Sequence, residues 1–310
     1  MIATPMQKVA QSLELKVNYH SDQCMKHSYE ISGQKIIKPV QMIEYKGQVV
    51  CPRCVVEQND KILEEQANAH YKKVDRLQKF NMLEKASVIT NKKIPLSRLS
   101  DYRVGCAETK SHKQAIEETL EELKNGKIQK VVFTGNQGTA KSFLAYSMLY
   151  ELNQHFWKIS QEEENYHLMK SCLYIELEAI TRMIMDSFDD KSSKYTLQYF
   201  VQLISKADFV VLDDLGAESG STNSNKQASD FIQRLLYAVS NARQGMSTFT
   251  TTNFTGKQLF NKYDAKTGSR LLGVFKSIEI HYSRSKACKF RILIRRNKNV
   301  CIMQRYGNYS

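Results

Sequence analysis

Long apolar runs are missing from this chain of 310 residues. No stretch approaches the roughly 18 consecutive apolar residues that a membrane-spanning helix needs. The first residues also lack the apolar segment and small-residue cleavage site of a signal peptide. These absences predict a soluble, cytoplasmic protein that has no membrane partner.

The cysteine count is unusual for a disulfide framework. Seven cysteines is an odd number, and Cys24, Cys51 and Cys54 crowd into the first fifth of the chain, which favours metal binding in a reducing compartment. Cys24-x2-His27 and Cys51-x2-Cys54 form two ligand pairs with the spacing of a closed, tetrahedral, structural Zn²⁺ site. His20 is the substitute ligand for His27, and free thiols beside a surface histidine are the alternative interpretation. The ion is expected to supply much of the folding free energy, on the order of 10 kcal/mol.

Acidic side chains are scarce towards the carboxyl end. Residues 257–310 contain 13 Lys and Arg residues against only Asp264 and Glu279, so most of the net charge of +13 lies there. A basic end of this size attracts polyanions, with nucleic acid as the first candidate and a solvated surface as the alternative. We expect DNA binding that weakens steeply with salt.

Proline and glycine are absent from residues 57–85, where apolar residues recur at steps of three and four. This pattern predicts a long amphipathic helix. Residues 29–50 are typical of short strands and turns. The sequence therefore predicts a small zinc-binding α+β domain at 1–86 that ends in this helix, a linker at 87–110 and a larger domain at 111–310 with a basic C-terminal extension.

In the larger domain, apolar strands alternate with helical patterns, which predicts an α/β fold with a parallel sheet flanked by helices. The expected strands are Lys130–Thr134, Ser171–Leu177, Phe209–Asp213 and Thr248–Thr252. The expected helices cover 112–124, 140–155, 178–188, 195–205 and 226–242.

A phosphate-binding loop follows the first of these strands and precedes a helix, which is the context that the P-loop motif requires. Its residues are Gly135, Asn136, Gln137, Gly138, Thr139, Ala140, Lys141 and Ser142. Backbone N–H groups and the helix N-terminus bind the phosphates of ATP, Lys141 meets the β- and γ-phosphates, and Ser142 ligates Mg²⁺. Ala140 replaces the last glycine of the motif, which predicts reduced affinity or turnover. A β-to-α turn with a surface lysine is the alternative.

Two carboxylates end the strand that begins at Phe209. At the carboxyl end of a parallel strand, Asp213 is expected to hold Mg²⁺ and Asp214 to polarise the water that attacks the γ-phosphate. Asn253, just after the next strand, either orients that water or caps the helix expected at residues 255–261.

The motifs GNQGTAKSFLA, VVLDDLGAE, TTTNF, GSRLL and HYSRS together resemble the AAA+ core of bacterial helicase loaders of the DnaC and DnaI type, with the IstB-type transposition ATPases as relatives. The resemblance covers roughly residues 95–285. It implies an ATPase in which Asn253 is sensor 1, Arg270 is an arginine finger reaching a neighbouring subunit, and Arg284 is the sensor 2 arginine that contacts ATP. Self-association through the AAA+ domain is therefore expected, because a finger acts on another subunit's nucleotide.

The zinc ligand pattern resembles the N-terminal domain of the DnaI branch, which binds the replicative helicase. The leading hypothesis is therefore a loader in a bacterial cell, encoded by a chromosome or a phage, that places a hexameric replicative DNA helicase on single-stranded DNA. An IstB-type ATPase that remodels duplex DNA, and a nucleotide-responsive adaptor with little turnover, are the alternatives.

Overall fold

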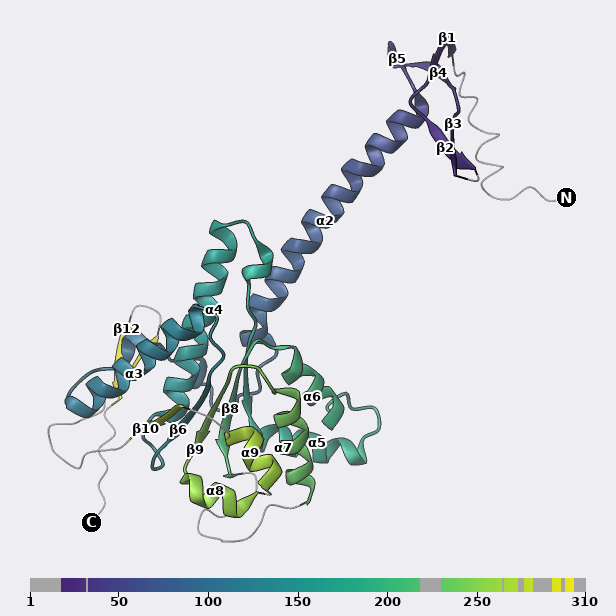
Figure 1. Cartoon of the computed structure of the whole chain (residues 1–310). Helices are drawn as coiled ribbons and strands as arrows, with labels where there is room; N and C mark the ends of the chain where they lie inside the picture. Colours follow the sequence, from purple (N-terminus) through teal and green to yellow (C-terminus); the bar gives the residue numbers. More distant parts are fainter. Residues whose placement is uncertain are drawn as a thin grey trace, which may run out of the picture. The chain divides into compact units, whose positions relative to one another are not determined.

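The computed structural model describes residues 18–31, 33–217, 230–263, 265–272, 276–280, 292–296 and 299–303. The chain divides into two compact units, residues 1–73 and 74–310, and the division falls within helix α2 (Pro52–Lys85). Figure 1 labels the elements of both units. Across the described residues, no helix is both long and apolar enough to span a membrane. The polar segment at residues 218–227, whose composition predicts a loop, and Arg284 lie outside the described residues.

The first unit is a small antiparallel assembly followed by the start of α2. One sheet has the order β1-β4-β5, and β2 pairs with β3 in a hairpin. The bounds are β1 Asn18–Cys24, β2 Ser28–Ile31, β3 Gln34–Ile37, β4 Val40–Tyr45 and β5 Gln48–Val50. Both Lys46 and Gly47 have positive φ, as a tight two-residue hairpin turn requires. Among this unit's described residues, only His27 and Cys51 are buried, so apolar packing contributes little to its stability.

The second unit is built on a five-stranded parallel sheet with the order β10-β6-β9-β8-β7. Its strands are β6 Lys130–Thr134, β7 Cys172–Glu176, β8 Phe209–Leu215, β9 Thr248–Thr252 and β10 Lys276–Glu279. Strands β6 and β9 have the predicted bounds, and β7 and β8 differ from the prediction by one or two residues at an end. These strands are nearly continuous runs of buried residues, as expected for a parallel sheet covered on both faces.

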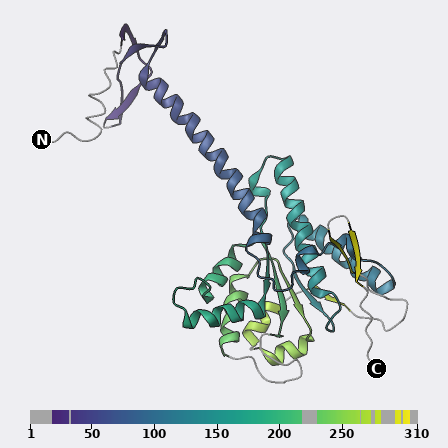
Figure 2. The same cartoon turned by 180° about the vertical axis from the view of Figure 1, so that it is seen from behind.

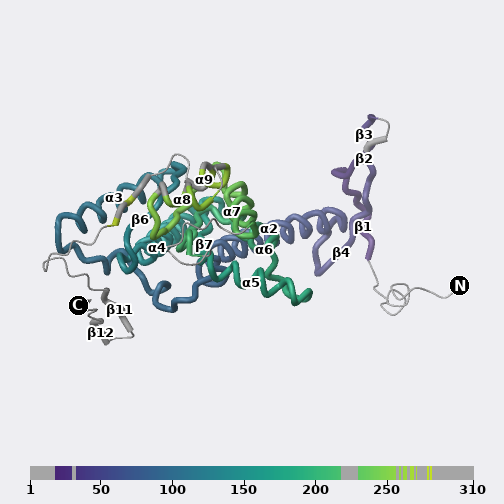
Figure 3. Tube along the Cα trace, turned by 90° about the horizontal axis from the view of Figure 1, so that it is seen from below, coloured from purple at the N-terminus to yellow at the C-terminus, as the bar shows by residue number. Residues whose placement is uncertain are grey.

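Helices cover both faces of this sheet (Figures 1 and 2). Val131 and Phe133 of β6 pack in one hydrophobic cluster with α3 and α4, whereas Val132 packs in the other with α5, α6 and α7. The helices are α3 Ala107–Lys124, α4 Lys141–Glu162, α5 Leu177–Asp189, α6 Leu197–Lys206, α7 Asp230–Ala242, α8 Gly256–Lys262 and α9 Ala265–Leu272. The alternation follows from the two-residue period of a strand. The expected fold class is confirmed at the level of architecture: one unit is an α/β fold with a parallel sheet flanked by helices, and the other is a small α+β unit (Figure 3).

The segment after α2 is not a free linker, because it pairs with the edge strand β7. Val88 forms a parallel bridge with Ile175, receives a hydrogen bond from the Glu176 N–H at 3.0 Å, and donates one to the Tyr174 carbonyl at 2.9 Å. Two short 3₁₀ turns, Ile94–Leu96 and Leu99–Asp101, follow before α3. The first residues of the expected linker at 87–110 therefore extend the edge of the sheet.

A buried arginine connects the N-terminal ends of β8 and β9 by hydrogen bonds. Arg243, only 2% exposed, donates hydrogen bonds to carbonyl oxygens and to the Thr248 hydroxyl. The accepting carbonyls belong to Ile204, Ala207, Asp208 and Ser247. Burial lowers the pKa of Arg243 to about 10, which still leaves the guanidinium charged at neutral pH. Its planar fork suits several fixed carbonyls at once.

Candidate metal centre and nucleotide site

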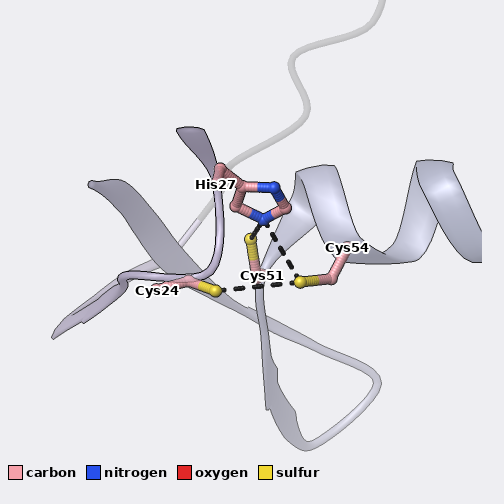
Figure 4. A group of neighbouring side chains, drawn as sticks. All are labelled: Cys24, His27, Cys51 and Cys54. Carbon is pink, nitrogen blue, oxygen red and sulfur yellow. Dashed lines mark hydrogen bonds between the residues drawn. The ribbon is translucent and has the colours of Figure 1, made fainter. Parts of the chain in front are cut away.

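Four side chains converge in the first unit (Figure 4). Their ligand atoms lie within 4.8 Å of one another, and they are Cys24, His27, Cys51 and Cys54. Cys24 ends β1, and Cys54 lies in the first turn of α2. The Cys24 and Cys54 sulfurs are 3.7 Å apart. Tetrahedral Zn²⁺ with Zn–S bonds of about 2.3 Å separates its sulfurs by roughly 3.8 Å. The residues thus fit a zinc ion, with His27 and not His20 as the fourth ligand.

The imidazole orientation identifies its ligand atom. His27 Nε2 lies 3.2 Å from both the Cys51 and Cys54 sulfurs, while Nδ1 lies 3.3 Å from a carboxylate oxygen of Glu57. Such a carboxylate holds a metal-bound histidine in one tautomer. Burial acts to raise the pKa of Cys51, but hydrogen bonds from the Cys54 backbone and His27 outweigh it and lower the pKa to about 7. Burial and the neighbouring sulfurs of Cys24 and Cys51 instead raise the pKa of Cys54 to about 11, so the thiols of this group differ in acidity before a metal binds.

The P-loop in the second unit connects β6 to α4, and its backbone needs left-handed conformations. Gly135 has φ +145, and a Cβ there would lie 2.1 Å from the Ile280 carbonyl oxygen, so no side chain fits. Gly138 and Ala140 have φ +82 and +68. The Ala140 side chain packs against the core cluster that contains α4. The left-handed backbone conformation costs an L-residue such as Ala140 about 1–2 kcal/mol. The alanine therefore strains the loop backbone.

Lys141 begins α4 and is 7% exposed. Its ammonium donates hydrogen bonds to the carbonyls of Gly135 (2.9 Å) and Asn136 (2.8 Å) and to Asn253 Oδ1 (2.8 Å). Burial lowers its pKa, and the carboxylates of Asp214 and Asp213 oppose this shift. The lysine ammonium is thus held over the loop, where it can bind a phosphate. The alternative of an ordinary β-to-α turn with a surface lysine predicts an exposed side chain and does not fit this burial.

Asp213 and Asp214 lie at an irregularity in the pairing of β8 with β9, where the register shifts between Leu212 and Leu215. Bulges of this kind re-aim side chains, and Asp214 has φ +59. Thr251 of β9 joins the pair, because its hydroxyl donates to Asp213 Oδ1 at 2.6 Å and accepts from the Asp214 N–H at 2.8 Å. Burial and then the Asp213 carboxylate raise the pKa of Asp214.

Asn253 completes this arrangement. Its Nδ2 donates to Asp214 Oδ1 at 3.1 Å while its Oδ1 accepts from Lys141. The cap of α8 is supplied instead by Thr255, whose side chain accepts from the Gln258 N–H. The structure therefore brings Lys141, Asp214 and Asn253 into one network.

A cavity of about 130 Å³ opens beside the two aspartates. Its lining residues are Ile89, Thr90, Asn91, Ile94, Ser142, Tyr174, Glu176, Glu178, Asp213 and Asp214. Ser142 and Asp213 both face it, so the expected hydroxyl and carboxylate ligands fit a hydrated Mg²⁺ ion, which keeps several waters. A wider groove of about 810 Å³ along α3 is lined largely by glutamates, which disfavours phosphate there.

The two arginines expected from the resemblance have different outcomes. Arg270 on α9 lies with its guanidinium 4.6 Å from the ring centre of Tyr237, and its Nη1 is buried without a hydrogen-bond partner among the described residues. Arg284 lies outside the described residues. The roles of both as finger and sensor stay predictions.

Several residues near the sites were missed by the sequence reasoning. Thr251 lies two positions before Asn253, and alternation places both on one face of the strand. Glu57 lies three positions after Cys54, on the same face of α2. Those spacings are signals that could have identified both. The contact of Thr90 with Glu176, at 2.8 Å from the N–H and 2.6 Å from the hydroxyl, had no such signal.

Comparisons with known proteins return structural neighbours only. No family model matches the sequence, and no curated protein is similar to it. A DnaC helicase loader has 17% identity and a TM-score of 0.46, and covers 61% of this chain and 99% of its own. DnaI has 20% identity and a TM-score of 0.47, and covers 63% and 96%. DnaA from Aquifex aeolicus with bound AMPPCP has 16% identity and a TM-score of 0.44, and covers 60% and 50%. Scores this low carry no functional conclusion, so function is argued from the residues of the sites.

Proposed function

We propose that this protein is an ATP-dependent helicase loader: an AAA+ ATPase whose zinc unit binds a hexameric replicative helicase during the initiation of DNA replication. The observation that supports ATP chemistry is the network of Lys141, Asp213, Asp214 and Asn253 at the carboxyl edge of one parallel sheet, directly beside a P-loop. Ligands of open α/β sheets bind at that edge.

Each residue has a role in phosphoryl transfer. Lys141 and the loop N–H groups bind the β- and γ-phosphates, and Ser142 with Asp213 would hold Mg²⁺, which supplies charge stabilisation when bound. Asp214, with its raised pKa, polarises the attacking water, and Asn253 orients it through the amide that already contacts Asp214. Arg270 acts on the nucleotide of a neighbouring copy and Arg284 on its own, as the motif resemblance implies.

The helicase and DNA roles rest on the motif resemblance and on charge. The Cys₃His unit is joined to the ATPase in one chain, as in the DnaI branch, and its exposed side chains include apolar residues such as Tyr19 (73%) and Met25 (58%) that a partner can cover. The basic residues of 257–310 suit single-stranded DNA. These features favour a loader over an IstB-type ATPase, whose N-terminus is not of this kind.

The decisive assay measures ATP hydrolysis and helicase loading onto circular single-stranded DNA by the full-length protein. Lys141→Ala should abolish both, whereas Lys158→Ala, which removes an exposed lysine on the same helix, should leave both unchanged. Normal ATP binding with hydrolysis at the no-enzyme rate would select the low-turnover adaptor. Stronger binding to duplex than to single-stranded DNA, with no loading, would select the transposition-type ATPase.

A further inference from the structure

Tyr174, in the middle of β7, is fully buried, and its hydroxyl lies close to Asp213 and Ser142 without a well-aligned hydrogen bond to any described residue. Its ring packs against Tyr146, with centroids 5.7 Å apart. Buried polar groups in proteins nearly always have a partner, so an unpaired one calls for a water, an ion or a ligand to supply it. The tyrosine hydroxyl can both donate and accept a hydrogen bond.

The position of Tyr174 limits what that partner can be. It lines the same cavity of about 130 Å³ as Ser142 and Asp213, the two residues assigned to Mg²⁺. Both are near enough to its hydroxyl to alter its pKa, which burial raises well above the ordinary value. Because Thr251 already donates to Asp213 Oδ1, the other carboxylate oxygen is available for a second donor.

A hydrated magnesium ion matches this environment. Mg²⁺ gives up its waters reluctantly and binds through one or two protein groups plus phosphate oxygens. Its bound waters are hydrogen-bond donors, which need acceptors around the ion. The cavity offers carboxylates and a phenol oxygen, and a few waters fill its volume.

We propose that Tyr174 is a magnesium-positioning residue. Its hydroxyl accepts a hydrogen bond from a water bound to the Mg²⁺ that accompanies ATP, and donates a hydrogen bond to the Asp213 carboxylate. This inference rests on the proposed ATPase function and adds a residue to that site. Tyr174 lies next to the two residues assigned to Mg²⁺, so its proposed role is exerted through the ion.

The substitution Tyr174→Phe isolates the hydroxyl, because the ring and its packing remain. Loss of a group in the outer shell of a metal typically weakens metal binding by about 10-fold or more. We therefore expect the Mg²⁺ concentration for half-maximal nucleotide binding to rise about 10-fold, while affinity for nucleotide without Mg²⁺ stays within about twofold. Tyr146→Phe is the matched control, since Tyr146 is a buried neighbour that does not line the cavity.

The experiment titrates the full-length wild type and both variants with a fluorescent ATP analogue over a series of Mg²⁺ concentrations, and counts bound Mn²⁺ by electron paramagnetic resonance. A shift in Mg²⁺ and Mn²⁺ dependence confined to Tyr174→Phe supports the proposal. Equal metal dependence in all three proteins overturns the proposal. If, in addition, the urea midpoint falls for Tyr174→Phe alone, the hydroxyl has a structural role instead. A wild type that binds no nucleotide overturns the proposed ATPase function itself, and with it the role of Tyr174.

Discussion

The substitution Thr251→Val tests how Asp213 and Asp214 are held in position. Thr251 is 1% exposed, and its hydroxyl bridges two neighbours by donating to the Asp213 carboxylate and accepting from the Asp214 N–H. Valine has nearly the same shape but neither donates nor accepts, so both hydrogen bonds are lost together. The N–H from which Thr251 accepts belongs to a residue with φ +59, a conformation that L-residues seldom adopt.

The expected loss in unfolding free energy is about 3 kcal/mol. A hydrogen bond to a charged group contributes about 1.5–3 kcal/mol, and an N–H left unpaired in a buried position costs about 1–3 kcal/mol. The two terms share one hydroxyl and are not independent, so their full sum is not expected. Thr251→Ser keeps the hydroxyl and loses one methyl group, which costs about 1 kcal/mol.

Urea unfolding followed by tryptophan fluorescence measures this directly. Trp157 is the single tryptophan, lies on α4 and packs against Phe80 with centroids 4.4 Å apart, so it reports unfolding of the second unit. We also expect ATP hydrolysis to fall about 10-fold in the valine variant and to survive in the serine variant. Equal stability and activity for the valine and serine variants would refute the argument that the hydroxyl holds the aspartates.

Further expectations concern Asp214, Arg243, the zinc ion and Glu57. Asp214→Asn should abolish ATP hydrolysis yet raise the thermal midpoint of unfolding at pH 7, because the folded-state pKa of Asp214 is raised and its charged form destabilises the fold above that pKa. This gain in midpoint should vanish as the pH falls towards 4, and asparagine also tolerates the positive φ of this position. A midpoint below that of the wild type at pH 7 would contradict this reasoning. Arg243→Met should lower the free energy of unfolding in urea by about 3–5 kcal/mol, because several buried carbonyls lose their hydrogen-bond donor. Arg243→Lys should recover only part of that free energy. A loss below about 1 kcal/mol for the methionine variant would show that water replaces the guanidinium. Zinc chelation should unfold the first unit, as followed by circular dichroism, without changing Trp157 fluorescence. Glu57→Gln should weaken zinc binding about 10-fold, because Glu57 contacts the Nδ1 atom of His27. An unchanged zinc affinity would count against that contact.

Local patterns predicted most of the core. The strands Lys130–Thr134 and Thr248–Thr252 were predicted to the residue because each is a short apolar or β-branched run between clear breaks. The helix expected at 57–85 begins earlier, at Pro52, because a proline is tolerated in the first turn of a helix. The α4 helix continues to Glu162, beyond the expected residue 155, since no glycine or proline stops it.

What the sequence could not predict depends on pairing between segments that are far apart in the chain. The bulge that turns Asp214 arises from the register of β8 against β9. The sequence pattern predicts Tyr174 only as part of an apolar strand, whereas the surroundings of its hydroxyl are set by Asp213 on β8 and Ser142 on α4. The attachment of Val88 and Thr90 to β7 was missed because their polar surroundings resemble those of a linker.

Light scattering coupled to size exclusion tests the central proposal most directly, with the full-length protein mixed with the replicative helicase of a candidate bacterial host, with and without ATP. The loader account predicts a stable complex that is lost when residues 1–73 are deleted or when Cys51 and Cys54 are replaced by serine, and is kept when the exposed Lys158 is replaced by alanine. The absence of a complex with every plausible helicase, under conditions in which the protein binds ATP, would contradict it.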